Sequence, residues 1–291
     1  MVLWTPKMLQ SLSDINNAFS DGRFHSQRFL KNAGVTTSGR WVDWTFASGQ
    51  PLYDAKVGTA GRFTPLVAQG NDAIYFPAIP AGMERRLTGI TVRSSSAGGP
   101  MSVLIVDVLG YYPLIDGDST DLQVFDNALT LPRYADGVGV MPVLVSSVAP
   151  SVQDGIGTFT YIGADDVERT GGAFRFQNST LNGLVATVPA NAAAGEGSLS
   201  MPLANGARGC KAVTSLRYTQ PPSGLAAIYM VRVLGSVLTN GNQSLAAEKQ
   251  FLVHNGFSAP RVFDGAYINL FYRYGTSASA DFFGEMTFAW G

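Results

Sequence analysis

The sequence has few charged residues, one cysteine and two histidines, and each shortage excludes a class of protein. Only 14% of its 291 residues are charged, against about 25% in an ordinary soluble domain. The formal net charge of -1 leaves no cationic excess to neutralise phosphates, so we expect no direct nucleic-acid partner. A single cysteine, Cys210, excludes an intramolecular disulfide framework, and together with two histidines it is too little for an ordinary zinc cluster.

Long apolar runs are also missing. The run at 103–109 is far shorter than the roughly 20 residues that cross a bilayer. Lys7, Asp14 and Asp21 interrupt the apolar stretch that a signal peptide would need. The sequence contains no Gly-x-Ser-x-Gly elbow, no phosphate loop and no complete dinucleotide fingerprint. We therefore expect no membrane partner, no cofactor, no metal and no catalytic residue, and thus a protein that is not an enzyme.

What the sequence does contain is typical of an all-β protein. Short runs rich in Val, Ile, Thr, Phe and Tyr, such as 87–93, 102–109 and 226–234, are separated by clusters of turn-forming residues. No long segment with helical periodicity lies between these runs, which argues against a parallel sheet built from βαβ units. The pattern predicts β-sandwich or jelly-roll-like architecture.

An internal duplication is the most informative feature. The segment VDVLG at 106–110 is matched by VRVLG at 231–235, and PRYADG at 132–137 is matched by PRVFDG at 260–265. GTFTYIG, which ends at Gly163, resembles EMTFAWG, which ends at Gly291. The matches stand in the same order, and the changes in spacing fall in turn-rich stretches, where loops absorb them. We predict two tandem homologous units, 41–157 and 158–291, behind an N-terminal helical arm and linker at 1–40.

The arm is predicted to contain an amphipathic helix. Thr5 and Pro6 are a good cap and first turn, and apolar residues then recur at helical spacing until Asp21 and Gly22. The following segment, 24–30, is open to a helical or an extended interpretation. An isolated helix this short is marginal in water, so its apolar stripe needs a partner. The stripe is expected to contact another subunit through Met8, Leu12, Ile15 and Phe19.

The duplicated Pro-Arg-x-x-Asp-Gly motif predicts a structural turn. Proline fixes an extended entry, glycine permits a positive φ, and the arginine is placed to pair with the aspartate three residues later. The turn residues are Pro132, Arg133, Asp136 and Gly137 in the first copy and Pro260, Arg261, Asp264 and Gly265 in the second. The alternative is that Arg133 and Arg261 bind an anionic ligand.

The loop with Asp116, Asp118 and Asp121 has the acidic spacing of a calcium site. The corresponding loop of the second copy, 240–242, is Asn-Gly-Asn, which keeps the turn chemistry and loses the charge. We therefore favour a plain turn over a metal site confined to the first copy.

Tyr111 and Tyr112 follow directly on the VDVLG segment. Tyrosine is enriched at subunit interfaces, so an interface role is favoured for this pair. The alternative is stacking on sugar rings at a loop tip.

Low charge, fifteen arginines against five lysines and β-units in tandem describe a chain that buries much of its surface against neighbours. With the PRYADG and terminal TFAWG segments, the chain resembles virion structural proteins of tailed bacteriophages, of the capsid-associated or decoration type. The resemblance implies a homo-oligomeric subunit of the virion, made in the host cytoplasm, that binds and stabilises neighbouring capsid subunits. The alternatives are a receptor-binding or carbohydrate-binding tail protein and a capsid shell subunit.

Overall fold

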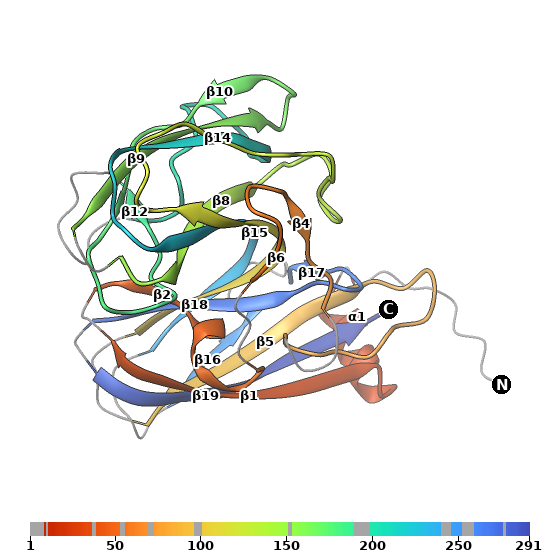
Figure 1. Ribbon diagram of the computed structural model, residues 1–291. Helices are drawn as coiled ribbons and strands as arrows, with labels where there is room; N and C mark the ends of the chain where they lie inside the picture. Colours follow the sequence, from red (N-terminus) through yellow and green to blue (C-terminus); the bar gives the residue numbers. More distant parts are fainter. Residues whose placement is uncertain are drawn as a thin grey trace.

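The described part of the protein consists mainly of three antiparallel β-sheets in layers, with the short helix α1 near its N-terminal end (Figure 1). This computed structural model describes residues 9, 11–36, 39–52, 56–68, 73–95, 101–150, 153–188, 198–239, 246–251, 259–275 and 278–291. The all-β sandwich architecture predicted from the sequence is confirmed.

The sheet at the bottom of Figure 1 is called the β5–β19 sheet, and its strand order is β16-β5-β19-β1-β3, with β17 also paired to β5. Its strands are β1 (Phe24–Thr36), β3 (Ser48–Gln50), β5 (Arg85–Ser94), β16 (Ala247–Gln250), β17 (Arg261–Val262) and β19 (Ala278–Trp290). The central sheet has the order β2-β18-β6-β15-β8, with β4 paired to β6. Its strands are β2 (Trp41–Asp43), β4 (Thr64–Pro65), β6 (Met101–Asp116), β8 (Val140–Val148), β15 (Leu225–Leu238) and β18 (Ile268–Tyr274), and the 3-10 helix η1 (Trp44–Phe46) follows β2.

The sheet at the top of Figure 1 is called the β9–β14 sheet, and its order is β13-β12-β11-β9-β14-β7, with β10 paired to β9. Its strands are β7 (Gln123–Val124), β9 (Gly155–Gly163), β10 (Glu168–Thr170), β11 (Phe174–Phe176), β12 (Thr187–Val188), β13 (Ser198–Leu199) and β14 (Cys210–Gln220). Strand β9 alternates strictly between buried and half-buried residues, as expected for a sheet with one face on the core.

The central sheet is buried on both faces, and its sequence shows why. Residues 105–113 of β6 are all buried, and so are residues 226–231 of β15. A strand covered on both sides has a nearly continuous apolar sequence, whereas a strand with one wet face alternates. These long runs therefore place β6 and β15 in the middle of the molecule.

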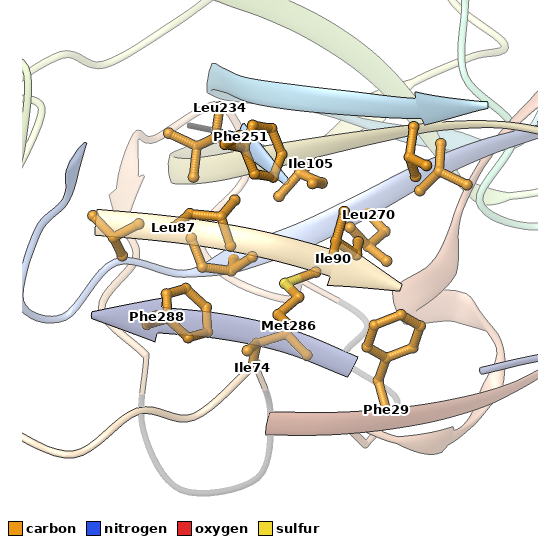
Figure 2. Packing of buried hydrophobic residues seen from close by; sticks show 14 of the residues in the cluster. Phe29, Ile74, Leu87, Ile90, Ile105, Leu234, Phe251, Leu270, Met286 and Phe288 are labelled. Atoms are coloured by element: carbon orange, nitrogen blue, oxygen red, sulfur yellow. The ribbon is translucent and has the colours of Figure 1, made fainter. Parts of the chain in front are cut away.

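Two hydrophobic cores lie between the central sheet and the outer sheets, and a third cluster includes Val106, Tyr111, Tyr229 and Phe271 of the central sheet. In the first core, Ile105, Leu234 and Leu270 of the central sheet pack against the β5–β19 sheet (Figure 2). The partners from that outer sheet include Phe29, Leu87, Ile90, Met286 and Phe288. In the second core, residues of β6, β8 and β15 pack against the β9–β14 sheet, whose contribution includes Phe159, Tyr161, Phe174, Leu216 and Tyr218. Strand β15 contributes to both of these cores. The N-terminal half of β15 packs in the second core, and its C-terminal half packs in the first core.

The two VxVLG segments lie side by side as neighbouring antiparallel strands. Val106 pairs with Val233, Asp107 with Arg232 and Val108 with Val231. In the duplicated sequence, Val106 corresponds to Val231 and Val108 corresponds to Val233. Exchange of the two copies therefore turns each of these strand pairs into another, with the Asp107 and Arg232 pair at the centre. A local two-fold relation therefore passes through the middle of the central sheet.

The other strand pairs obey the same relation. Arg232 of β15 pairs with Val140 of β8, and the matching positions, Asp107 of β6 and Ile268 of β18, also pair. In the outer sheets, β5 pairs with β19 and the matching β14 pairs with β9. Strands from the two halves of the sequence are therefore interleaved in each sheet. The boundary expected at 157/158 falls inside β9, and the division into 41–157 and 158–291 stays a prediction about the sequence.

The N-terminal segment contains one helix, α1 (Leu12–Ser20), which packs against β19. Ser11 is its N-cap and forms a capping box with Asp14, so the helix begins later than the predicted Thr5 cap, which lies outside the described residues. The segment 24–30, left open between helix and strand, is extended and belongs to β1. No helix among the described residues is long and apolar enough to cross a membrane.

Matching glycines in the two VxVLG segments allow matching contacts with a phenylalanine ring. A methyl group at Gly110 would come within 2.4 Å of the Phe63 ring, and one at Gly235 within 2.2 Å of the Phe251 ring. Both rings are buried. Glycine at the end of this motif is therefore explained by close packing of an aromatic ring on the central sheet.

We expect Gly235→Ala to lower the free energy of unfolding by about 1–3 kcal/mol, because the added methyl group overpacks a filled site. Phe251→Leu removes the atoms that clash, so the double variant should lose less stability than the sum of the two single variants. Urea unfolding of the four proteins measures this coupling. Additive losses would show that the ring does not decide the preference for glycine.

Candidate functional site

The two Pro-Arg-x-x-Asp-Gly turns meet at the surface of the molecule. Gly137 and Gly265 have φ values of 68° and 71°, the left-handed conformation that the turn requires and glycine accepts. The Tyr134 ring of the first turn contacts the Phe263 ring of the second edge to face, with 4.9 Å between ring centroids. Segments that stand 128 positions apart in the sequence are thereby brought together.

The arginine of the first turn is fully engaged inside the protein. Arg133 donates from Nε to Asp107 Oδ2 at 2.9 Å and from Nη2 to Asp107 Oδ1 at 2.7 Å. It also donates to the carbonyl oxygens of Leu66 and Val108. Burial raises the pKa of Asp107, and the hydrogen bonds and charge of Arg133 oppose this rise. This forked, charge-assisted pair fixes the first turn to β6.

The arginine of the second turn has a different partner and stays half-exposed. Arg261 contacts Glu84 Oε1 at 2.9 Å, and its guanidinium lies 4.3 Å from the centroid of the Phe263 ring. Asp264 pairs with Arg85. The expected pairing of each arginine with the aspartate three residues later is therefore wrong, because both arginines find carboxylates on strands or segments distant in the sequence.

A cleft of about 280 Å³ lies between the two turns. It is lined by Ile79, Met83, Glu84, Arg85, Pro132, Arg133, Arg261, Val262, Phe263 and Asp264. Pairing of β17 with β5 places Arg261 opposite Arg86 and Val262 opposite Arg85. The sequence singled out Arg133 and Arg261 as anion-binding candidates, but no motif pointed to Arg85 and Glu84, which reach the cleft through strand pairing.

The acidic loop is a hydrogen-bonded turn. Asp116 Oδ1 accepts from the backbone N–H of Asp118 at 2.9 Å, and Ser119 Oγ accepts from the N–H of Asp121 at 3.0 Å. Gln123 closes the loop through two hydrogen bonds with the backbone of Asp116. Within the described ranges, no three His, Cys, Asp or Glu side chains are grouped as metal ligands would be.

An apolar surface runs along α1 and β1. Leu12, Phe19, Phe24 and Leu30 are all exposed, and we call these four residues the α1–β1 surface. The Phe19 and Phe24 rings contact each other with 5.1 Å between centroids. Of the predicted interface residues, Leu12 and Phe19 belong to this surface, Ile15 is buried in the first core, and Met8 lies outside the described residues.

The backbone edge of β1 adjoins this surface. Residues 24–29 of β1 pair with β19 on one side, and on the other side the described residues cover β1 only from Leu30 to Asn32, through β3. An open groove of about 560 Å³ lies beside this edge. It is lined by Gln27, Arg28, Phe29, Leu30, Gln50, Phe283 and Gly284.

Tyr111 and Tyr112 are buried by the chain itself. Tyr111 donates its hydroxyl hydrogen to the carbonyl of Val57 at 2.6 Å, and Tyr112 donates to Asn127 Oδ1 at 2.5 Å. The Tyr112 hydroxyl also accepts from the backbone N–H of Val213 at 3.0 Å. Both rings are parts of the cores of this chain, and their expected contact with another subunit stays a prediction.

No family model matches the sequence, and no curated protein matches it significantly. Among solved structures, the chain is similar to one from the Gt strain of infectious bursal disease virus, with 14% identity over 91% of this chain and 80% of that chain and a TM-score of 0.19. It is also similar to T=1 particles derived from this virus (14% identity, 91% and 77% coverage, TM-score 0.19) and to a VP2 subviral particle (11% identity, 91% and 80% coverage, TM-score 0.18). These weak neighbours are viral capsid proteins, and at such TM-scores the likeness supports no inference about shared architecture.

We expect Arg133→Met to lower the free energy of unfolding by about 3–5 kcal/mol at neutral pH, because it leaves the Asp107 carboxylate buried and unpaired. The pKa of Asp107 is raised in the folded state, so protonation favours folding of the variant. The decrease in the free energy of unfolding should be largest above the raised pKa of Asp107 and should become smaller as the pH falls through that pKa. Urea unfolding over a pH series measures the effect. The control, Arg133→Met with Asp107→Asn, should lose less at neutral pH and show no such recovery.

Joint replacement of Asp116, Asp118 and Asp121 by Asn should change the free energy of unfolding by less than about 0.5 kcal/mol, because asparagine keeps the side-chain oxygen that the turn uses. Thermal unfolding with and without a chelator provides the measurement. A large loss in the variant, reproduced in the original protein by the chelator, would reveal a calcium site.

Proposed function

We propose that this protein is a structural component of a virus particle that binds and stabilises neighbouring capsid subunits, and that it works by binding and not by catalysis. The observation that carries the proposal is the α1–β1 surface beside the open edge of β1. Exposed aromatic and aliphatic side chains next to unpaired strand backbone favour contact with another protein chain.

The low charge of the chain supports the same role. Association removes charged groups from water at a cost, so stable interfaces are depleted of charge. Seven of the charged residues of the described part, including Lys31, Asp43 and Lys56, are already buried inside the chain. Charged residues are thus few in the chain as a whole, and part of them do not reach its surface.

A homo-oligomer in the virion is the form we propose for this contact. One exposed edge strand can pair with the same strand of a second copy, and repeated contacts in a symmetric particle multiply avidity. The viral particles among the similar structures agree with this role but do not carry it. Decoration of a capsid is favoured over a shell role by the sequence resemblance alone.

Substitution of the α1–β1 surface tests the proposal. We expect Phe19→Ser with Phe24→Ser to keep the fold, since both rings are exposed, and to weaken self-association by about tenfold or more per ring, as lost burial of about 1.5 kcal/mol implies. Sedimentation velocity of the full chain and its recovery with purified particles are the measurements. Point changes are preferred because deletion of residues 1–34 would remove most of β1 from its sheet.

The matched control is Leu122→Ser with Val124→Ser, which removes two exposed apolar side chains near β7, away from the α1–β1 surface. This control should associate like the original protein. If the original protein is monomeric and absent from particles, or if both double variants behave alike, the proposed role is wrong. Binding of glycans by the isolated chain would favour the receptor-binding alternative.

A further inference from the structure

We propose that the cleft between the two Pro-Arg turns binds a carboxylate group through Arg261 and Arg85. This site is separate from the α1–β1 surface and does not depend on the virion role. Figure 1 shows the element that forms one wall, β17, at the junction between the central sheet and the β5–β19 sheet.

The charges around the cleft do not balance. Glu84 contacts both Arg261 and Arg86, with distances of 2.9 Å and 2.8 Å, and Asp264 contacts Arg85 at 3.2 Å. Three guanidinium groups therefore share two carboxylates. Arg133 does not change this count, because Asp107 neutralises it. One positive charge is left over in this cluster of ion pairs, in which Glu84 is shared between Arg261 in the cleft and Arg86 beside it.

Hydrogen-bond donors are also left over. The side chain of Arg85 is almost fully buried, yet its Nε has no hydrogen-bond partner among the described residues, and the same is true of Arg86 Nε. Burial lowers the pKa of Arg85, and Asp264 only opposes this effect. A buried donor without an acceptor is destabilising, and an anion that accepts from it would offset this cost.

The duplication explains why the second arginine is available for a ligand. In the first copy, Asp107 binds Arg133 and closes that site. The position that matches Asp107 in the second copy is Arg232, which donates to the carbonyl of Val138. Arg261 therefore has no carboxylate at the matching place, and 46% of its side chain stays exposed beside Glu84.

The shape of the site favours a carboxylate attached to a small organic group. One surplus positive charge matches one negative charge, and a guanidinium presents two parallel N–H groups to a planar carboxylate. Phe263 holds the Arg261 guanidinium at 4.3 Å from its ring centroid, which limits its orientation. Ile79, Met83 and Phe263 supply apolar walls for the rest of the ligand in a volume of about 280 Å³.

Titration of the full chain with benzoate, and with neutral benzamide as its matched control, tests the proposal by calorimetry. We expect benzoate to bind, benzamide not to bind, and Arg261→Gln to weaken benzoate binding by about tenfold or more. Arg62→Gln is the control variant, because Arg62 is 47% exposed and also pairs with an aspartate, outside the cleft. It should bind benzoate like the original protein.

The carboxylate has two possible sources, a free acid or an acidic side chain of a neighbouring subunit, and the variants distinguish them. Benzoate binding that Arg261→Gln weakens supports a free acid. Absence of benzoate binding, together with loss of self-association in Arg261→Gln but not in Arg62→Gln, supports a side chain. The proposal is overturned if benzamide binds as tightly as benzoate, if Arg261→Gln binds benzoate unchanged, or if benzoate does not bind and Arg261→Gln associates normally.

Discussion

The pairing of β6 with β15 is the contact on which the rest of the structure depends. These two strands carry the matching VxVLG segments, and their antiparallel register places Asp107 opposite Arg232. Both strands are long and apolar on both faces, so each outer sheet packs on a part of the same pair. Since each outer sheet also joins strands from the two halves of the sequence, neither half has a complete sandwich without the other.

At the centre of the local two-fold relation the two copies carry residues of opposite charge, and this difference decides how the two Pro-Arg turns are held. An aspartate in one copy and an arginine in the other occupy matching positions. The first turn is consequently tied into the interior through Arg133, while Arg261 of the second turn is left at a cleft with a surplus of guanidinium groups. A buried ion pair adds little net stability compared with apolar packing, but a pair that loses one partner is costly. Since the second copy has Arg232 where the first has Asp107, the matching Arg261 pairs with Glu84 instead.

Local patterns in the sequence predicted the parts of this fold that local physics decides. Alternation and turn residues predicted strands, the positive φ of Gly137 and Gly265 follows from turn chemistry, and amide replacement of the acidic loop in the second copy pointed to a plain turn. Partners distant in the sequence were not predictable in this way. The segment 24–30 is extended because β19 pairs with it, and Arg133 selects Asp107 over Asp136 because β6 passes beside the turn. The residues next to segment 24–30 and next to Arg133 in the sequence do not indicate either of these partners.

Some of the few charged residues order the interior of the chain. Lys31 donates to the carbonyl of Ala47, Lys56 to the hydroxyl of Tyr267, and Asp43 accepts from Asn269, all in buried positions. These contacts satisfy buried polar groups, and they specify one arrangement of an otherwise apolar interior. They also remove charge from the surface, where it would oppose contact with other chains. The buried polar contacts thus order the interior, while apolar side chains such as Phe19 and Phe24 stay exposed, where contact with another chain would bury them.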